Sequence, residues 1–270
     1  MPELPEVEVT RMGIAPHLKD RRIVGVLVRD GRLRRPVNED LAELLVGQRI
    51  QALERRGKYL LLHLDQGQLL LHLGMSGSLR VLPRHTPLRT HDHVDIYLDH
   101  DQVLRFHDPR RFGLVLWGSN WFAEPLLAKL GPEPFDSCFD GAYLFRRSRG
   151  RQQPVKGFLM DNQTVVGVGN IYANESLFRS GIDPRRAAGR ISLARYEHLA
   201  RTVVTVLQEA IAQGGTTLRD FTHPDGESGY FRLSLLAYGR AGQPCQHCGT
   251  CLRELRLAGR STVYCPHCQH

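Results

Sequence analysis

The chain has 270 residues, of which 41% are hydrophobic and 24% are charged. This balance excludes a disordered chain, a collagen-like rod and a coiled coil, and the length suffices for one large domain or two medium ones. No apolar run approaches the roughly 20 residues of a membrane helix, and the acidic start is unlike a secretory signal. We therefore expect a cytoplasmic protein with no membrane partner.

Basic residues outnumber acidic ones by 36 to 28, which gives a formal net charge of +8. Most of them are arginines, since lysine occurs only at positions 19, 58, 129 and 156. Guanidinium groups bind phosphate in a bidentate way, so this excess favours a polyanionic partner. An arginine-rich codon usage would produce the same excess, and charge alone does not separate the two explanations.

The first half of the chain is predicted to be mostly β-structure after a helix at residues 3–12. Short runs rich in leucine and β-branched residues alternate with turn residues, and Asp65-Gln66-Gly67 has the composition of a hairpin turn. Such a series predicts a β-sandwich or a β-barrel. Residues 83–93 are expected to form an exposed loop. The predicted strands cover residues 22–28, 49–53, 59–64, 68–73, 78–82, 94–98, 103–106 and 114–117.

Helical spacing replaces the strand pattern after Trp121. Gly131-Pro132-Glu133-Pro134 is a cluster of breaking residues, and an apolar stripe from Leu193 predicts a long helix with Ser192 as its N-cap and Gly214-Gly215 at its end. The polar, glycine-rich stretch 220–230 is expected to be a loop. We expect four segments: a first domain at 1–133, a linker at 134–153, a helical domain at 154–236 and a small module at 237–270.

The small module has the cysteine spacing of a zinc site. Two Cys-x2-Cys pairs flank residues 249–264, which can form a hairpin turning near Ala258-Gly259. One structural zinc ion would replace a core that so short a segment cannot build. Unliganded thiols and a redox pair are the alternatives, although no thioredoxin-like pattern accompanies the cysteines. The expected ligands are Cys245, Cys248, Cys265 and Cys268, with Cys251, His247 and His267 as competitors.

The N-terminus carries residues that suit amine chemistry. Removal of Met1 would expose the secondary amine of Pro2, and an α-amino group titrates near pH 8, so part of it is neutral and nucleophilic at pH 7. Glu3 and Glu6 follow at helical spacing and could transfer protons or position the amine. The same residues are also ordinary for a helix start, where proline and acidic side chains are favoured.

Several motifs occur together along the chain. They are MPELPEVE at the start, Gly57-Lys58, HLGMSG at 72–77, HDPRRFG at 107–113, MDNQTVVGVGNIY at 160–172 and RSTVYC at 260–265. In this order they resemble the formamidopyrimidine-DNA glycosylases, and the resemblance covers essentially the whole chain.

The resemblance implies an α+β protein of two domains. The first would be an N-terminal β-sandwich with a catalytic N-terminal helix. The second would be a helical domain with a helix–two-turn–helix element and a β-hairpin zinc finger. The implied activity is that of a bifunctional DNA glycosylase and AP lyase of base excision repair. It would remove 8-oxoguanine and formamidopyrimidines from damaged double-stranded DNA as a nucleoid-associated monomer with no nucleotide cofactor.

The resemblance also implies roles for individual residues. Pro2 would attack C1′ and form a Schiff base, after which β,δ-elimination would cut the strand. Glu3 matches the acid and base of the family, and Glu6 matches an acid that arranges the terminus. Lys58 matches a lysine that reaches the lesion and its phosphate. Arg260 of the finger completes the catalytic set.

Further residues match the family's DNA contacts. A glycosylase must flip its nucleotide out of the duplex, and the gap needs filling. Met75, Arg110 and Phe112 match the void-filling residues, although core packing would also suit Met75 and Phe112. Lys156 matches a lysine near the lesion pocket. Asn170 and Arg260 match phosphate contacts.

Two loops are less well defined by the motifs. The loop 84–93 has no clear counterpart in the family, and its histidines, His85, His91 and His93, are expected at the surface. His91 is nevertheless a candidate DNA contact. The loop 217–230 resembles the lesion-capping loop of the purine-specific branch.

Three alternatives remain open from the sequence. The related endonuclease VIII group has the same fold and prefers oxidised pyrimidines, although Leu4 and the run 110–112 match the purine-specific branch. A non-enzymatic zinc-finger DNA-binding protein would explain the charge and the finger but not the Pro2-Glu3 terminus. A tautomerase that uses an N-terminal proline would need neither the zinc module nor the arginine surface.

Overall fold

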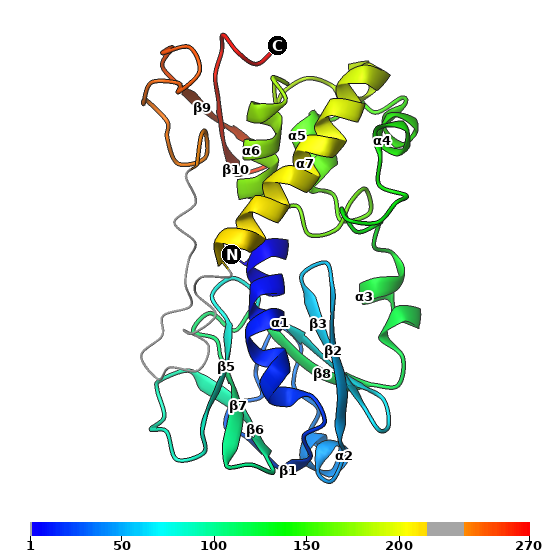
Figure 1. The fold of residues 1–270 in the computed structure, drawn as a ribbon, viewed down its shortest axis with the longest axis vertical. Helices are drawn as coiled ribbons and strands as arrows, with labels where there is room; N and C mark the ends of the chain where they lie inside the picture. The colour runs from blue at the N-terminus through cyan, green and yellow to red at the C-terminus, as the bar shows by residue number, and fades with distance from the viewer. Residues whose placement is uncertain (1, 215–234) are drawn as a thin grey trace. The chain divides into compact units, whose positions relative to one another are not determined.

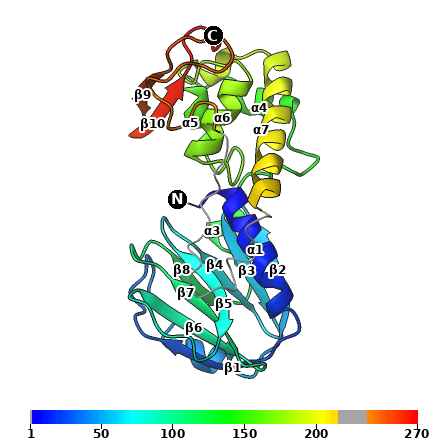
Figure 2. The ribbon, with the colours of Figure 1, turned by 60° about the vertical axis from the view of Figure 1, so that its left-hand side comes forward.

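The computed structural model describes residues 2–214 and 235–270 (Figures 1 and 2). It divides into two compact units, one of residues 1–128 with 211–231 and one of residues 129–210 with 232–270. Among the described residues, no helix combines the length and the apolar character needed to cross a membrane. Two predictions lie outside the described residues. They are the glycine-rich loop at 220–230 and the lesion-capping loop at 217–230.

The first unit is built on two four-stranded antiparallel sheets. One has the strand order β2-β3-β4-β8 and the other the order β1-β6-β7-β5. The predicted sandwich is confirmed, because each of the eight predicted strands exists and the strands form two separate sheets rather than a barrel. The strands are β1 (Ile23–Val28), β2 (Ile50–Arg56), β3 (Tyr59–Leu64), β4 (Gln68–His72), β5 (Ser78–Pro83), β6 (Asp92–Leu98), β7 (Gln102–His107) and β8 (Leu114–Gly118).

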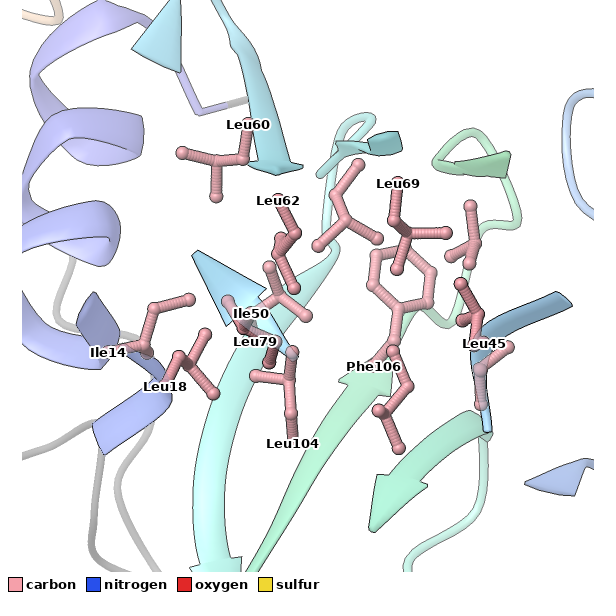
Figure 3. Close-up of a cluster of buried hydrophobic side chains, with 14 of the residues drawn as sticks. Ile14, Leu18, Leu45, Ile50, Leu60, Leu62, Leu69, Leu79, Leu104 and Phe106 are labelled. Atoms are coloured by element: carbon pink, nitrogen blue, oxygen red, sulfur yellow. The ribbon is translucent and has the colours of Figure 1, made fainter. Parts of the chain in front are cut away.

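The core of this unit lies between the two sheets (Figure 3). In β3, Leu60 and Leu62 point into it, as the two-residue period of a strand requires. Leu104 and Phe106 of β7 enter it from the other sheet. Each fully buried side chain of this kind contributes about 1.5–3 kcal/mol relative to an exposed one.

Helix α1 (Leu4–Leu18) is longer than the predicted helix 3–12. Gly13 and Pro16 weaken the helical signal after Met12, but Ile14 and Leu18 are fully buried in the sandwich core. Tertiary burial therefore outweighs local propensity at this end of the helix. Short helices complete the unit: α2 (Leu41–Leu45), η1 (Trp121–Ala123) and α3 (Pro125–Ala128).

The loop after β5 is shorter than predicted. Strand β6 begins at Asp92, so His93 lies in the strand and is only 3% exposed. The expectation that His93 lies at the surface is therefore wrong, whereas His85 and His91 are exposed. The sequence did not reveal the start of this strand because its first two residues, Asp92 and His93, are polar. His93 is buried with its Nε2 in a hydrogen bond, described below.

The second unit is helical, with one β-hairpin. Helix α7 begins after Ser192, whose Oγ accepts a hydrogen bond from the N–H of Arg195 at 3.4 Å and so acts as the predicted N-cap. Within the described residues the helix ends at Gly214. The elements are α4 (Gly141–Ser148), α5 (Val155–Met160), α6 (Asn170–Arg179), η2 (Ala188–Arg190), α7 (Leu193–Gly214), β9 (Arg253–Leu257) and β10 (Arg260–Tyr264). The last turn of α7, from residue 211, is grouped with the first unit.

The stretch 134–153, expected to be a linker, contains helix α4. Asp140 caps this helix by accepting the N–H of Tyr143, and Leu144 is fully buried in the core of the second unit. The hydroxyl of Tyr143 also donates to the carbonyl of Thr164 at 2.8 Å. The stretch is therefore part of a packed unit, because its few apolar residues fall on one face of a short helix.

Candidate functional site

The N-terminal residues form the start of helix α1. Glu3 is the N-cap and is 2% exposed, and Glu6 accepts a hydrogen bond from the backbone N–H of Glu3 at 2.7 Å. The two acids form a capping box, which satisfies backbone donors that a helix start otherwise leaves unpaired. Pro2 directly precedes this box and is half-buried. The helix cap thus holds the backbone next to Pro2 in one conformation.

Lys58 lies at the tip of the two-residue turn between β2 and β3. Gly57 enables this tight turn with a φ of 58°. Arg55 donates to Glu8 of α1 at 2.8 Å and to the carbonyl of Gly57 at 3.1 Å. Burial raises the pKa of Glu8, but hydrogen bonds from Arg11 and Arg55 lower it further than burial raises it, so the carboxylate stays charged. The ion pair joins helix α1 to the turn that carries Lys58.

The fully buried carboxylate of Asp108 organises the turn that follows β7. Its Oδ1 accepts hydrogen bonds from the N–H of Arg110 at 3.3 Å and the hydroxyl of Ser76 at 3.1 Å. Its Oδ2 accepts the N–H of Gly113 at 2.8 Å. One side chain therefore fixes the turn of Arg110 and connects it to the loop that contains Met75.

The same two loops also touch through their backbones. Gly74 has a φ of 63°, and a Cβ added there would lie 2.5 Å from the carbonyl carbon of Phe112 and 2.6 Å from the nitrogen of Gly113. Phe112 is 45% exposed, and the guanidinium of Arg110 lies 5.3 Å from the centre of its ring. The two side chains are therefore presented outwards from a rigid, tightly packed base.

A cavity of about 320 Å³ adjoins this base and is lined by Arg34, His72, Gly74, Met75 and Phe112. Burial, together with the charges of Lys58 and Arg34, lowers the pKa of His72 to about 4. The Nδ1 of His72 accepts the N–H of Gly74 at 3.0 Å, so the neutral ring carries its proton on Nε2. His72 is thus a neutral hydrogen-bond donor at pH 7. His72 was not predicted as a site residue, although it begins the motif at 72–77.

His91 lies beside the Asp108 turn. The carbonyl of His91 accepts the N–H of Asp108 at 3.1 Å, and the Nε2 of His93 donates to the carbonyl of Asp108 at 2.9 Å. His91 is exposed and has a φ of 74°, which is uncommon for a non-glycine residue. The structure therefore brings Met75, His91, Arg110 and Phe112 onto three neighbouring loops of one unit.

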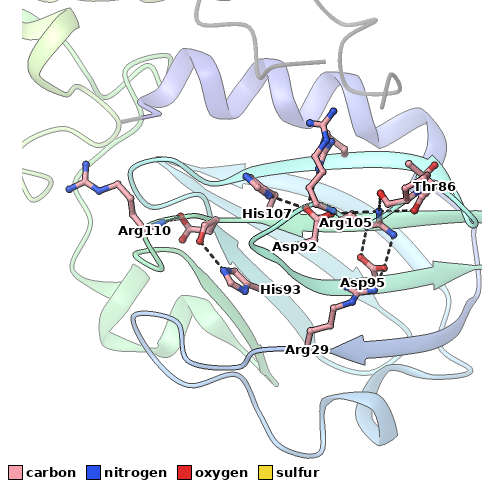
Figure 4. A network of polar contacts seen from close by, with 12 residues as sticks. Arg29, Thr86, Asp92, His93, Asp95, Arg105, His107 and Arg110 are labelled. Atoms are coloured by element: carbon pink, nitrogen blue, oxygen red, sulfur yellow. Dashed lines mark hydrogen bonds and ion pairs between the residues drawn. The ribbon is translucent and has the colours of Figure 1, made fainter. Parts of the chain in front are cut away.

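A buried polar network orders the loop that precedes His91 (Figure 4). Arg105 is 2% exposed and binds both oxygens of Asp95 at 2.8 and 2.9 Å. The Nη1 of Arg105 donates to the carbonyls of Thr86 and Pro87 at 3.1 and 3.2 Å. Burial raises the pKa of Asp95, but hydrogen bonds from Arg105 and Arg29 lower it overall, so a charged carboxylate holds the network together.

In the second unit, Asn170 is the first residue of helix α6 and is half-buried. The N–H groups at a helix start favour an anion, and the preceding Gly167-Val168-Gly169 turn has no large side chain. Asn170 is therefore well placed within its unit to meet a phosphate.

The other two predicted contacts of this unit differ in exposure. Arg260 is exposed at the first position of β10. Lys156 is only 1% exposed, and its Nζ donates to the carbonyl of Ser261 and to Oγ1 of Thr262, both at 2.7 Å. Lys156, predicted as a DNA contact, is therefore bonded to the finger rather than presented at the surface.

The four predicted zinc ligands form one cluster. The Sγ atoms of Cys245, Cys248, Cys265 and Cys268 lie within 4.8 Å of one another. The Cys248–Cys265 and Cys245–Cys268 pairs are 3.5 and 3.9 Å apart, close to the roughly 3.8 Å that tetrahedral Zn–S bonds of about 2.3 Å require. Among the candidate competitors, Cys251 is exposed and His247 packs against Phe178. The cluster fits one zinc ion, and the predicted hairpin turn at Ala258-Gly259 is confirmed.

Three family models match the chain in order. They are the formamidopyrimidine-DNA glycosylase N-terminal domain at residues 1–115, the formamidopyrimidine-DNA glycosylase H2TH domain at 130–222, and the zinc finger found in FPG and IleRS at 242–270. The chain belongs to the formamidopyrimidine-DNA glycosylase family. The family resemblance, the fold class and the zinc finger predicted from the sequence are thereby confirmed.

Close relatives agree with this assignment over the full length. The formamidopyrimidine-DNA glycosylases of Acidithiobacillus ferrooxidans and Marinobacter nauticus are 64% and 59% identical over 269 residues, with 100% of each chain covered. A solved complex of Lactococcus lactis Fpg with DNA containing an abasic site is similar, with a TM-score of 0.90, 31% identity and 99% of both chains covered.

Proposed function

We propose that this protein is a bifunctional DNA glycosylase and AP lyase of base excision repair that removes oxidised purines from double-stranded DNA. The observation that carries the proposal is the full-length match to formamidopyrimidine-DNA glycosylases at 64% identity. The related Lactococcus lactis Fpg has been crystallised with DNA that contains an abasic site and with DNA that contains Fapy-dG.

Pro2 is the proposed nucleophile. Once Met1 is removed, the neutral secondary amine attacks C1′ of the damaged nucleotide, the bond from C1′ to the base breaks, and the base leaves with its electron pair. The proton of the amine passes to the carboxylate of Glu3. Opening of the sugar ring turns the adduct into an iminium, which withdraws electrons from C2′. The capped start of α1 supports this role, because it fixes the backbone that carries the amine.

Glu3 is the proposed proton donor and acceptor. Its carboxyl group protonates the ring oxygen as the sugar opens, and the resulting carboxylate then removes a C2′ proton, which expels the 3′ phosphate. A second elimination expels the 5′ phosphate. Lys58 and Arg260 would stabilise the leaving phosphates by charge. Glu6 keeps the terminus in place by accepting the N–H of Glu3.

Met75, Arg110 and Phe112 are proposed to fill the space that the flipped nucleotide leaves. A thioether, a planar cation and an aromatic ring suit the stacked interior of a duplex. The rigid base formed by Gly74 and Asp108 supports this role, since a wedge must resist being pushed back. His91, on the neighbouring loop, would contact the DNA at the same side of the unit.

The second unit would hold the DNA backbone through Asn170 and Arg260. Contacts of this kind supply affinity without reading sequence, which suits an enzyme that selects damage. Zinc would be held by the four cysteines and would stabilise the hairpin that carries Arg260. Because each phosphate contact releases counterions, affinity should fall steeply between about 50 and 200 mM salt.

Borohydride trapping tests the proposal directly. Zinc-loaded protein that begins with Pro2 is mixed with a duplex that contains one 8-oxoguanine opposite cytosine, and the complex is reduced and digested. We expect a covalent DNA adduct on the Pro2 peptide by mass spectrometry, and none with an undamaged duplex. Binding of the damaged duplex without any adduct would overturn the proposed enzymatic activity.

Oxidised pyrimidines are the second candidate substrate. The observation that favours them is a solved complex of the similar Lactococcus lactis Fpg with DNA that contains an oxidised pyrimidine, at 31% identity and a TM-score of 0.89. Single-turnover rates on matched duplexes decide between the two classes. A faster rate on the pyrimidine duplex would replace the purine assignment.

A further inference from the structure

Lys156 is an unusual residue for the interior of the second unit. An ammonium group loses its hydration on burial, and this is strongly unfavourable unless other groups replace the water. The carbonyl of Ser261 and Oγ1 of Thr262, both 2.7 Å from Nζ, compensate for this loss. Both partners belong to β10, directly after Arg260. The buried cation therefore acts on the strand that carries Arg260.

Thr262 passes this contact on to Arg260. Its hydroxyl, which is fully buried, accepts the bond from Lys156 and donates its own proton to the carbonyl of Arg260 at 3.1 Å. A hydroxyl can accept and donate at once, so the chain of hydrogen bonds is continuous from Lys156 to the backbone of Arg260. These hydrogen bonds therefore hold the start of β10 at the carbonyl of Arg260, the carbonyl of Ser261 and the hydroxyl of Thr262.

Asn174 of α6 completes the arrangement from the other side. Its Oδ1 accepts the N–H of Val263 at 2.9 Å, and its Nδ2 donates to the carbonyl of Asn170 at 2.6 Å. The side chain is 1% exposed. One buried amide thus connects the next residue of β10 to the residue at the start of α6.

These contacts join two residues that are 90 positions apart in the chain. Asn170 and Arg260 lie at the ends of two elements, and the buried groups between them fix the spacing of those elements. Two groups can bind neighbouring parts of a DNA backbone without loss of ordering entropy only when their spacing is set in advance.

We infer that Lys156, Thr262 and Asn174 are positioning residues that set Arg260 against Asn170 for binding of the DNA backbone. The inference rests on the proposed function, in which Asn170 and Arg260 bind phosphate. It assigns Lys156 an indirect role, through Arg260, in place of a contact with the lesion.

A double-mutant cycle tests the inference. We would measure affinity for a duplex with a tetrahydrofuran abasic-site analogue at several salt concentrations, using the zinc-loaded full chain and the variants Lys156→Met, Arg260→Ala and their combination. Each single variant should bind roughly tenfold more weakly, the equivalent of one charge-assisted hydrogen bond. Each should also reduce the slope of log affinity against log salt by about 1.

The combined variant decides the matter. If Lys156 acts through Arg260, the combination should match Arg260→Ala in affinity and slope, because the second change removes nothing more. Additive losses, or wild-type binding by Lys156→Met, would overturn the inference. Wild-type affinity and slope in Arg260→Ala would instead contradict the proposed function.

A second pair of variants covers the case in which Lys156→Met does not fold. Thr262→Val keeps the shape but removes the hydroxyl, whereas Thr262→Ser keeps the hydroxyl. We expect weaker binding and a shallower slope for the first and near wild-type values for the second. Ser148→Ala removes another fully buried hydroxyl of this unit and is the matched control. Equal loss in Thr262→Val and Ser148→Ala would overturn the inference.

Discussion

The contact between Gly74 and the turn of Phe112 leads to a specific prediction for Gly74→Ala. The new methyl group would lie 2.5 Å from the carbonyl carbon of Phe112, whereas carbon atoms are in contact at about 3.5–4.0 Å. The backbone of Phe112 and Gly113 must therefore move by about 1 Å. A movement of that size displaces the exposed ring that is proposed to enter the DNA.

The magnitude has two parts. Alanine in the left-handed region lowers the free energy of unfolding by about 1–2 kcal/mol. Alanine also reduces the conformational entropy of the unfolded chain, which offsets about 0.4–1 kcal/mol of this loss. Overpacking against the turn adds about 1–3 kcal/mol. Gly47→Ala is the matched control, since Gly47 has a φ of 89° in the same unit but no atom within 4 Å of an added Cβ. We expect Gly74→Ala to be less stable than this control by about 1–3 kcal/mol.

Urea unfolding and single-turnover excision of 8-oxoguanine measure the two effects. Under conditions where both variants are folded, we expect Gly74→Ala to excise roughly 10- to 100-fold more slowly, because a displacement of about 1 Å is costly for a positioned group. Gly47→Ala should excise at the wild-type rate. Equal stability and equal rates in the two variants would refute the argument that Gly74 supports the turn.

Three further predictions concern other groups. Asp108→Asn replaces an acceptor oxygen by a donor, so one buried N–H or hydroxyl loses its partner. We expect the free energy of unfolding, measured with urea, to fall by about 1–3 kcal/mol. Cys248→Ser should lose its stoichiometric zinc on metal analysis and its DNA binding, whereas Cys251→Ser should retain both. The pKa of His72 is lowered from 6.5 to about 4, so the unfolded state binds the proton at a higher pH than the folded state does. The free energy of unfolding therefore falls by up to about 3 kcal/mol as the pH drops from 6.5 to 4. His72→Gln should show a flatter dependence in urea unfolding over that range, and an unchanged dependence would contradict the assignment.

Local patterns in the sequence were sufficient for the strands, the starts of helices α1 and α7, and the metal site. Short runs of leucine and β-branched residues between turn residues located β1 to β8, because each signal spans only a few neighbouring residues. The Cys-x2-Cys pairs predicted the zinc ligands for the same reason, since each pair is a local unit. The family motifs carried the resemblance and with it the candidate residues Pro2 and Glu3.

Only the tertiary structure decided which polar residues lie inside. Lys156 was predicted from the sequence as a DNA contact near the lesion pocket, but its hydrogen-bond partners are more than 100 positions away on β10. His93 and Asp108 acquire their roles from segments that meet in space. The physical reason is that burial of a charged or polar group depends on distant donors and acceptors, which no local pattern in the chain records.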